Sequence, residues 1–343
     1  MKISEYQKCL TELKGKTIAV VYIFEGEDAP GFEHYWVWKS DIIANWINAI
    51  QDINCIPYIV DVRTFTQKAV DNTLPKIDFV LNLNCGSVEL SSMSLVPSVC
   101  SFLSIPCIPC NSSAILMSEN KIVSNQLAIS KNIQTPEVVD SSYKNGIYRP
   151  LNLGSSIGVE IGKCGALGNQ GTYQEFIPGY DVTIPIMYNP LIETTAALPP
   201  IIYIPKNLDP NWIYSLEEKS HEGGVEMIAS PSMDSKMEES LLNFTHIFPI
   251  ETYGRIDARI KTENDCLTKS FTKKRFSLKD FYFIEINSMP TIEDNDSWQT
   301  ALKYATNEKD NCFAPCIKSY KKVFGKFNVN GFLLSSSMLA LTN

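Results

Sequence analysis

The sequence predicts an α/β protein with a parallel sheet in its first third and a strand-rich second half. Two observations support this prediction. Over residues 17–110, short apolar strand patterns alternate with helical spacings, which is the order that builds a parallel sheet. From Tyr173 onward, strand patterns dominate. The chain has no internal repeat and no low-complexity linker, so we expect packed units rather than an array.

In the first unit, three strand patterns alternate with two helical ones. The helix at 36–53 is indicated by large apolar residues that recur every four positions, from Trp38 to Ile50. The strands are expected at residues 17–24, 55–62 and 78–83, and the second helix at 91–103.

The second unit begins near Asn111, where Ser112 or Ser113 could cap a helix that runs to about Ser130. Pro136 then opens a short strand at 137–139. Later strands are expected at residues 173–177, 182–188, 200–204 and 224–228, and helices at 237–248 and 298–306. The apolar, serine-rich stretch 331–343 receives no assignment.

Composition limits the classes of function. The 343 residues are 44% hydrophobic and 20% charged, as in an ordinary globular protein with ample core. A net charge of −8, from 30 basic and 38 acidic residues, argues against a nucleic-acid partner. We find neither a signal-peptide pattern nor an apolar run of about 18 residues, and therefore expect a cytoplasmic protein that does not bind membranes.

The ten cysteines are scattered, most of them in apolar surroundings. Cys107 and Cys110 have the spacing of a redox or zinc half-site, but no second half-site follows at zinc-ribbon spacing. Cys312 and Cys316 receive no role. We expect buried, reduced thiols, and a cysteine-based redox or zinc protein is the alternative.

Residues 281–290 carry the clearest chemical pattern. Apolar and polar residues alternate over Phe281–Ile286, so Glu285 and Asn287 should project from one face of a strand. Asp257 lies in a shorter pattern, 256–260, that could pair alongside. Two carboxylates and an amide oxygen form the hard-oxygen site that Mg²⁺ prefers. The alternative is that both acids are solvated charges at strand ends.

A second group of residues suits phosphate. Gly154-Ser-Ser-Ile-Gly158 is a turn whose small residues let several backbone N–H groups, and the hydroxyls of Ser155 and Ser156, face one anion. Arg149 stands five residues earlier, at the end of a short strand, and Lys121 lies on the preceding helix. Alone, the turn is a weak signal, and a lysine on an amphipathic helix is usually a solvated surface residue.

The segment 173–181 suits a nucleoside. A strand whose backbone edge is exposed before a Pro-Gly turn can offer N–H and C=O groups to an adenine ring, here through Gln174, Glu175, Phe176 and Ile177. Asp181 could accept hydrogen bonds from ribose hydroxyls. An ordinary hairpin is the alternative.

Taken in chain order, these residues resemble the ATP-grasp superfamily, and more closely its D-alanine–D-alanine ligase branch, over roughly residues 17–300. Glu285-Ile-Asn-Ser-Met-Pro290 is similar to that branch's Glu-x-Asn-Thr-x-Pro. The 154–158 turn resembles its phosphate-covering Gly-Ser-Ser-x-Gly loop, and Arg255-Ile-Asp257 its Arg-x-Asp segment. The stretch 219–231 resembles its mobile lid in length, with Lys219 at the lid's lysine.

The resemblance implies an ATP-grasp fold in three parts. These are an N-terminal parallel-sheet (Rossmann-like) domain at 1–110, a reduced central subdomain at 111–178, and a larger C-terminal α+β subdomain with the metal site and the tail at 179–343. ATP is expected between the last two parts. A homodimer formed through the N-terminal domain is expected by analogy alone.

The resemblance also implies a reaction between two small molecules, a carboxylate and an amine. The carboxylate attacks the γ-phosphate of ATP to give an acyl phosphate and ADP, and the amine then displaces phosphate. Two Mg²⁺ ions on Asp257, Glu285 and Asn287 would bridge the β- and γ-phosphates. Lys121 and Arg149 would hold the α- and β-phosphates.

In the same scheme, Ser155 and Ser156 close over the γ-phosphate and exclude water. Arg255 steadies the oxyanion as the amine attacks, and Lys219 acts from the lid. His221 on the lid is near enough in sequence to touch substrate, although a solvent-exposed position is the alternative.

Departures from the family pattern bear on the substrate. The family usually has Lys-Pro where this chain has Arg149-Pro150, and an acid where it has Gln174. The first-domain His-Gly and Gly-Glu-Asp-Gly signature is missing, although Glu25 and Glu27 lie in the loop that would hold an amino group. The sequence therefore predicts a specialised biosynthetic ligase rather than a cell-wall D-alanine–D-alanine ligase.

The segment after the metal motif departs as well. Ser288, Thr291 and Asp296 fall where the second substrate would bind, and the acids added there would repel a carboxylate and suit an amine-bearing partner. Two further alternatives stay open. One is transfer of the acyl group to a carrier-protein thiol, and the other is an ATP-grasp protein that binds nucleotide without catalysis.

Overall fold

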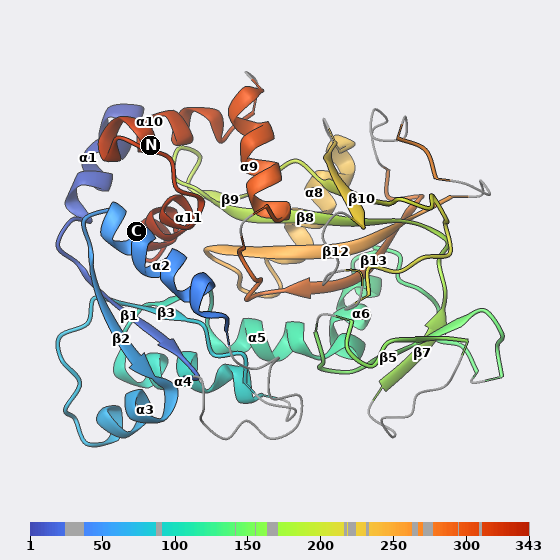
Figure 1. Ribbon diagram of the computed structural model, residues 1–343, viewed down its shortest axis with the longest axis horizontal. Coiled ribbons are helices and arrows are strands. Elements are labelled where there is room, and N and C mark those ends of the chain that lie inside the picture. Colours follow the sequence, from blue (N-terminus) through green and yellow to red (C-terminus); the bar gives the residue numbers. More distant parts are fainter. Residues whose placement is uncertain are drawn as a thin grey trace.

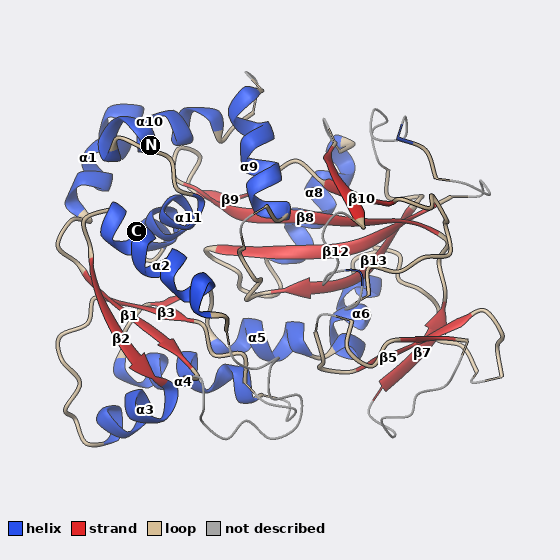
Figure 2. Cartoon of the chain, viewed as in Figure 1, coloured by secondary structure: helices blue, strands red, loops and turns tan. Residues whose placement is uncertain are grey.

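The computed structural model describes residues 1–24, 38–86, 91–140, 142–154, 156–162, 171–215, 218, 224–230, 233–262, 267–269, 277–293, 295–308 and 311–342. These residues build three sheets with helices packed around them (Figures 1 and 2). Within this part of the chain, no helix is both long and apolar enough to span a membrane.

The N-terminal sheet is parallel, as the sequence predicts. Its strand order is β2 (Ile56–Asp61), β1 (Thr17–Tyr22), β3 (Phe79–Asn82) and β4 (Cys107–Ile108). Successive residues of β1 face opposite ways, so Ile18 and Val20 pack with helix α2 (Ser40–Asp52) in one cluster. Ala19 and Val21 pack in a second cluster with residues of helices α3 (Val62–Val70) and α4 (Leu95–Leu103). A short 3₁₀ turn, η1 (Ser92–Ser94), precedes α4.

The helix expected at 112–130 is two helices, α5 (Ser112–Glu119) and α6 (Lys121–Ser130). Asn120 breaks it, because its backbone is extended (φ −86°, ψ 105°) and its side chain caps α6 by accepting from the N–H groups of Ile122 and Val123. Asn111, rather than Ser112 or Ser113, caps α5. The break makes Lys121 the first residue of α6.

A small antiparallel sheet has the order β6 (Glu160–Ile161), β5 (Gly146–Pro150) and β7 (Gly171–Glu175). The strand predicted at 137–139 is reduced to a single bridge between Val138 and Gln174. The predicted strand at 173–177 starts and ends two residues earlier, which leaves Phe176 and Ile177 as a connection to the large sheet.

The large antiparallel sheet has the order β11 (Val225–Ala229), β10 (Ile201–Pro205), β8 (Gly179–Asn189), β12 (Tyr253–Lys261) and β13 (Phe281–Asn287), with β9 (Thr194–Ala197) paired to β8. Helix α8 (Ser235–Thr245) packs on one face, where the Phe244 ring meets the Phe283 ring edge-on. Helix α9 (Ser297–Asn307) contributes Trp298, whose ring meets the Tyr253 ring edge-on.

Three helices at the chain ends are absent from the sequence prediction. They are α1 (Ile3–Glu12), α10 (Ala314–Phe324) and α11 (Val329–Ala340). Every residue of α11 from Asn330 to Leu339 is buried, in contact with α2 and β8 (Figure 1). A helix buried all round has no amphipathic period, so the pattern of 331–343 gave no signal.

Candidate functional site

A cleft of about 580 Å³ lies between the two antiparallel sheets, within the usual size range of ligand sites. Sixteen of the residues that the sequence singled out line it: Lys121, Arg149, Gly154, Ser156, Gln174, Glu175, Phe176, Ile177, Asp181, Arg255, Asp257, Glu285, Asn287, Ser288, Thr291 and Asp296. The other five, Glu25, Glu27, Ser155, Lys219 and His221, lie outside the described residues.

The carboxylates at the floor of the cleft come together through strand pairing. β12 and β13 are antiparallel, with Asp257 opposite Glu285 and Arg255 opposite Asn287, and a register shift follows Asp257. The predicted pairing of these strands is thereby confirmed. The Asn287 amide donates to Asp257 at 2.7 Å, and the Thr183 hydroxyl donates to the other oxygen of Asp257 at 2.7 Å.

Arg255 also holds Asp257. Its Nε and Nη2 atoms lie 2.9 and 2.7 Å from the two carboxylate oxygens. Burial alone would lower the pKa of Arg255, but the adjacent Asp257 carboxylate raises it, so the guanidinium stays charged. Arg255, which was expected to stabilise the oxyanion, is therefore ion-paired with Asp257, which was expected to bind Mg²⁺. Among the described residues, His, Cys, Asp and Glu side chains form no group of three or more that could hold a metal ion.

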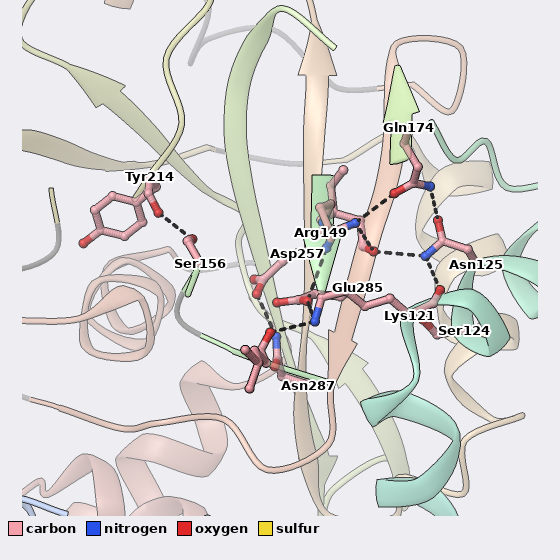
Figure 3. Close-up of polar contacts among 12 residues, drawn as sticks. Lys121, Ser124, Asn125, Arg149, Ser156, Gln174, Tyr214, Asp257, Glu285 and Asn287 are labelled. Carbon is pink, nitrogen blue, oxygen red and sulfur yellow. Dashed lines mark hydrogen bonds and ion pairs between the residues drawn. The ribbon is translucent and has the colours of Figure 1, made fainter. Parts of the chain in front are cut away.

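Two buried cations share Glu285. Lys121 Nζ and Arg149 Nη2 each lie 3.3 Å from Glu285 Oε2, and Lys121 also donates to the Leu153 carbonyl at 2.8 Å (Figure 3). Burial alone would raise the pKa of Glu285, but the two positive charges outweigh it and lower the pKa to about 2. Burial lowers the pKa values of Lys121 and Arg149. Because only 6% of Lys121 is exposed, the alternative of a solvated surface lysine is wrong.

A hydrogen-bond network around Arg149 holds its guanidinium in place (Figure 3). Arg149 donates to the side-chain oxygen of Gln174 at 3.4 Å and to the Ile284 carbonyl at 3.2 Å. The Gln174 amide donates to Asn125 and to the Pro136 carbonyl. Gln174 is buried, so its side chain positions Arg149 instead of facing solvent. Asn125 was not predicted, since a lone asparagine within a helix gives no signal in the sequence.

The connection after β7 offers one backbone donor. The N–H groups of Glu175 and Phe176 are bound to the carbonyls of Glu137 and Asn145, so the expected open strand edge is mostly covered. Across the described part of the chain, the N–H of Ile177 has no hydrogen-bond partner. A ring nitrogen acceptor could bind there.

The carboxylate expected to bind ribose is held on both sides. Asp181 pairs with Arg259 at 2.8 Å and accepts from the Tyr214 N–H at 3.0 Å. The Tyr214 carbonyl in turn accepts from the Ser156 hydroxyl at 2.9 Å, so the glycine-serine turn contacts the segment that follows β10 (Figure 3). Neither Arg259 nor Tyr214 was predicted, because each acts through a contact distant in sequence.

The predicted acceptor residues Ser288, Thr291 and Asp296 also line the cleft. Asp296 caps α9 by accepting from the Gln299 N–H, and its other oxygen accepts from the Glu293 N–H, both at 3.0 Å. Burial raises the pKa of Asp296 to about 6. The Ser288 hydroxyl is 2.7 Å from that of Ser118 and is buried.

The architecture is the ATP-grasp fold of D-alanine–D-alanine ligases. D-alanyl-alanine synthetase A from Vibrio cholerae superposes with a TM-score of 0.59 at 14% identity, over 91% of this chain and 99% of that one. D-alanine–D-alanine ligase from Bacillus anthracis, complexed with ATP, gives 0.55 at 13%, over the same shares. The VanG D-Ala:D-Ser ligase from Enterococcus faecalis gives 0.55 at 14%, over 90% and 100%.

At these identities the likeness establishes the fold, and the fold predicted from the sequence is confirmed. No family model and no curated protein sequence matches the chain.

Proposed function

We propose that this protein is an ATP-dependent carboxylate–amine ligase that forms an amide bond and releases ADP and phosphate. The observation that supports this proposal most is the meeting of two buried cations, Lys121 and Arg149, with Glu285 in a nucleotide-sized cleft of this fold. Burying charged groups of this kind costs free energy, and binding a phosphate-bearing ligand is a function that would account for them.

The cleft residues fit a nucleotide. The N–H of Ile177, which no other described residue accepts, suits an adenine ring nitrogen, and the Asp181 carboxylate suits the ribose hydroxyls. Lys121 and Arg149 would hold the phosphates, and Gly154 and Ser156 of the glycine-serine turn line the same cleft.

The donor set at the floor fits Mg²⁺. Asp257, Glu285 and Asn287 supply carboxylate and amide oxygens, and the first two are only 19% and 20% exposed in their side chains. Two ions bound there would neutralise charge on the transferring phosphoryl group. In this structure, Lys121 and Arg149 pair with Glu285, and Arg255 pairs with Asp257. Phosphate groups that bind Lys121 and Arg149 would free the Glu285 oxygens to bind metal.

The chemistry that follows is acyl activation. A substrate carboxylate oxygen forms a bond to the γ-phosphorus while the bond to the β,γ-bridging oxygen breaks, which gives an acyl phosphate and ADP. The neutral amine then attacks the acyl carbon, the bond between that carbon and the phosphate oxygen breaks, and the nitrogen loses one proton as the amide forms. The Ser156 turn keeps water from the acyl phosphate, and Arg255, once released from Asp257, stabilises the oxyanion.

The acids at the acceptor end favour an amine-bearing second substrate. Asp296 lines the cleft together with Glu293 and Thr291. A negatively charged wall attracts an ammonium group before it loses its proton, and repels a second carboxylate. An amino acid joined to another amine in specialised biosynthesis fits this arrangement.

Release of ADP and phosphate from Mg-ATP tests the proposal, with D- and L-amino acids supplied singly and in pairs and the products followed by mass spectrometry. We expect ADP release that requires two substrates, and a product whose mass equals their sum minus water. Tight nucleotide binding without turnover on any pair would contradict the ligase. It would favour a carrier-bound acceptor or a non-catalytic role.

A further inference from the structure

Arg259 is a buried cation on β12 that has no part in the reaction described above. Only 5% of it is exposed. Its Nε donates to the Ile177 carbonyl at 2.6 Å, and its Nη1 pairs with Asp181 at 2.8 Å. Its Nη2 donates to the carbonyls of Gly179 and Pro210 at 3.0 and 3.2 Å. The guanidinium is thus surrounded by acceptors, as a buried charge must be.

Three of these four acceptors belong to one short segment, residues 177–181, which includes the end of the connection between β7 and β8 and the first three residues of β8. The Phe176 ring also lies over the guanidinium, 5.0 Å away. Arg259 therefore holds the end of the connection and the start of β8 against β12. Lysine could not do this, because a single ammonium cannot reach four acceptors in different directions.

The two ends of this segment face the cleft with different chemistry. Among the described residues, the N–H of Ile177 has no hydrogen-bond partner, and its carbonyl accepts from Arg259. Asp181 has one oxygen on Arg259 and the other on the Tyr214 N–H, and its side chain remains 23% exposed. Because each carboxylate oxygen can accept two hydrogen bonds, Asp181 keeps acceptor capacity for neighbouring hydroxyls.

We propose that Arg259 is a positioning residue that fixes the Ile177 N–H relative to the Asp181 carboxylate, and so sets the preference for a nucleotide with intact ribose hydroxyls. The inference rests on the proposed nucleotide site. A carboxylate held in advance binds hydroxyls without the entropy cost of ordering a free side chain. Without Arg259, Asp181 and the connection would have to be ordered by the ligand.

The experiment compares ATP with 2′,3′-dideoxy-ATP by titration calorimetry, in Mg²⁺ and without amino acid substrates. The proteins are the wild type, Arg259→Met, Arg259→Lys and the matched control Lys261→Met, an exposed cation two residues further along β12. We expect the wild type and the control to bind ATP at least about tenfold more tightly than the dideoxy analogue.

In Arg259→Met this ratio should fall below about threefold and the Kd for ATP should rise, with Arg259→Lys in between. In the ligase assay, KM for ATP should rise while kcat at saturating ATP stays within about threefold, which a general loss of structure would not produce.

If Arg259→Met fails to fold, Arg259→Lys and Asp181→Asn carry the test. Asp181→Asn should lose the preference for ATP over the dideoxy analogue. The double variant Asp181→Asn/Arg259→Lys should show no further loss of this preference. The inference would be overturned if folded Arg259 variants kept the ratio of the two Kd values within twofold of the wild type. It would also be overturned if the wild type bound ATP and 2′,3′-dideoxy-ATP equally well. A wild type that binds no nucleotide would instead overturn the proposed function.

Discussion

Replacement of Glu285 by glutamine removes a charge on which two buried cations depend. Lys121 and Arg149 each lie 3.3 Å from this carboxylate, and only 7% of either cation's side chain is exposed. Glutamine has the same size and keeps one carbonyl oxygen, so the change leaves no cavity. What the variant loses is the negative charge.

The cost follows from the burial of the two cations. Removing one partner of a buried ion pair costs about 3–5 kcal/mol, and the partial exposure of Glu285 places the loss at about 3 kcal/mol. An unfolding entropy of about 2.1 cal/mol/K per residue gives roughly 0.7 kcal/mol/K for 343 residues, so Tm should fall by about 4 °C. Glu226→Gln is the matched control. It breaks an exposed pair with Lys269 on the same sheet and should cost less than about 1 kcal/mol.

Glu285→Gln should strengthen nucleotide binding and weaken turnover. In chelator, the phosphates of ADP no longer compete with Glu285 for Lys121 and Arg149, so ADP should bind about tenfold more tightly than to the wild type. Mg-dependent turnover should fall by far more than tenfold, because a metal ligand is lost.

Thermal denaturation with and without ADP in chelator, and coupled ADP release in Mg²⁺, measure these effects. An unchanged Tm would refute the ion-pair argument. A loss of turnover no larger than about tenfold, or roughly 1.4 kcal/mol of barrier, would refute the metal assignment.

Three further predictions concern the acceptor end and the nucleotide connection. Asp296→Ser keeps a capping oxygen for α9 but removes the charge, so KM for the amine should rise about tenfold while KM for ATP stays within twofold; an unchanged amine KM contradicts the acceptor role. Burial raises the pKa of Asp296 from 3.8 to about 6, so its protonation stabilises the fold fully below about pH 4, and this contribution is lost as the pH rises through 6. Urea unfolding between about pH 4 and 7 should therefore show a fall in stability that Asp296→Asn lacks. Glu285, with its pKa lowered to about 2, acts in the opposite sense, since its contribution is present above about pH 4.5 and lost as the pH falls through 2. Gly179→Ala should cost more than about 3 kcal/mol by chemical denaturation, because φ is +148° and a Cβ would clash with the Ile260 carbonyl oxygen, whereas Gly15→Ala, with φ +81° in open space, should cost only about 1 kcal/mol.

The sequence by itself determined the features that depend on local period. Alternation over 281–287 places Glu285 and Asn287 on one face whatever surrounds the strand, and the pattern around Asp257 made a neighbouring strand the natural partner. The parallel N-terminal sheet followed from strands alternating with helices, because short connections permit few other arrangements. The fold followed from the order of motifs along the chain.

Tertiary structure alone decided which charges are buried and what they pair with. Lys121 has the local pattern of a surface lysine, but the break at Asn120 and the nearby β5 and β13 bury it against Glu285. Arg259 and Asp181 are 78 residues apart, so no local pattern could show that they pair. Gln174 looked like a nucleotide contact, whereas packing turned its side chain toward Arg149.

Helix α11 likewise depends on tertiary packing and not on a local sequence pattern. Its apolar and serine side chains have no solvated face, so the sequence lacked the amphipathic period by which helices are found. Local patterns are fixed by backbone geometry, which the sequence carries directly. Burial, ion pairing and pKa shifts depend on the environment that distant segments create, and that environment exists only after the chain has folded.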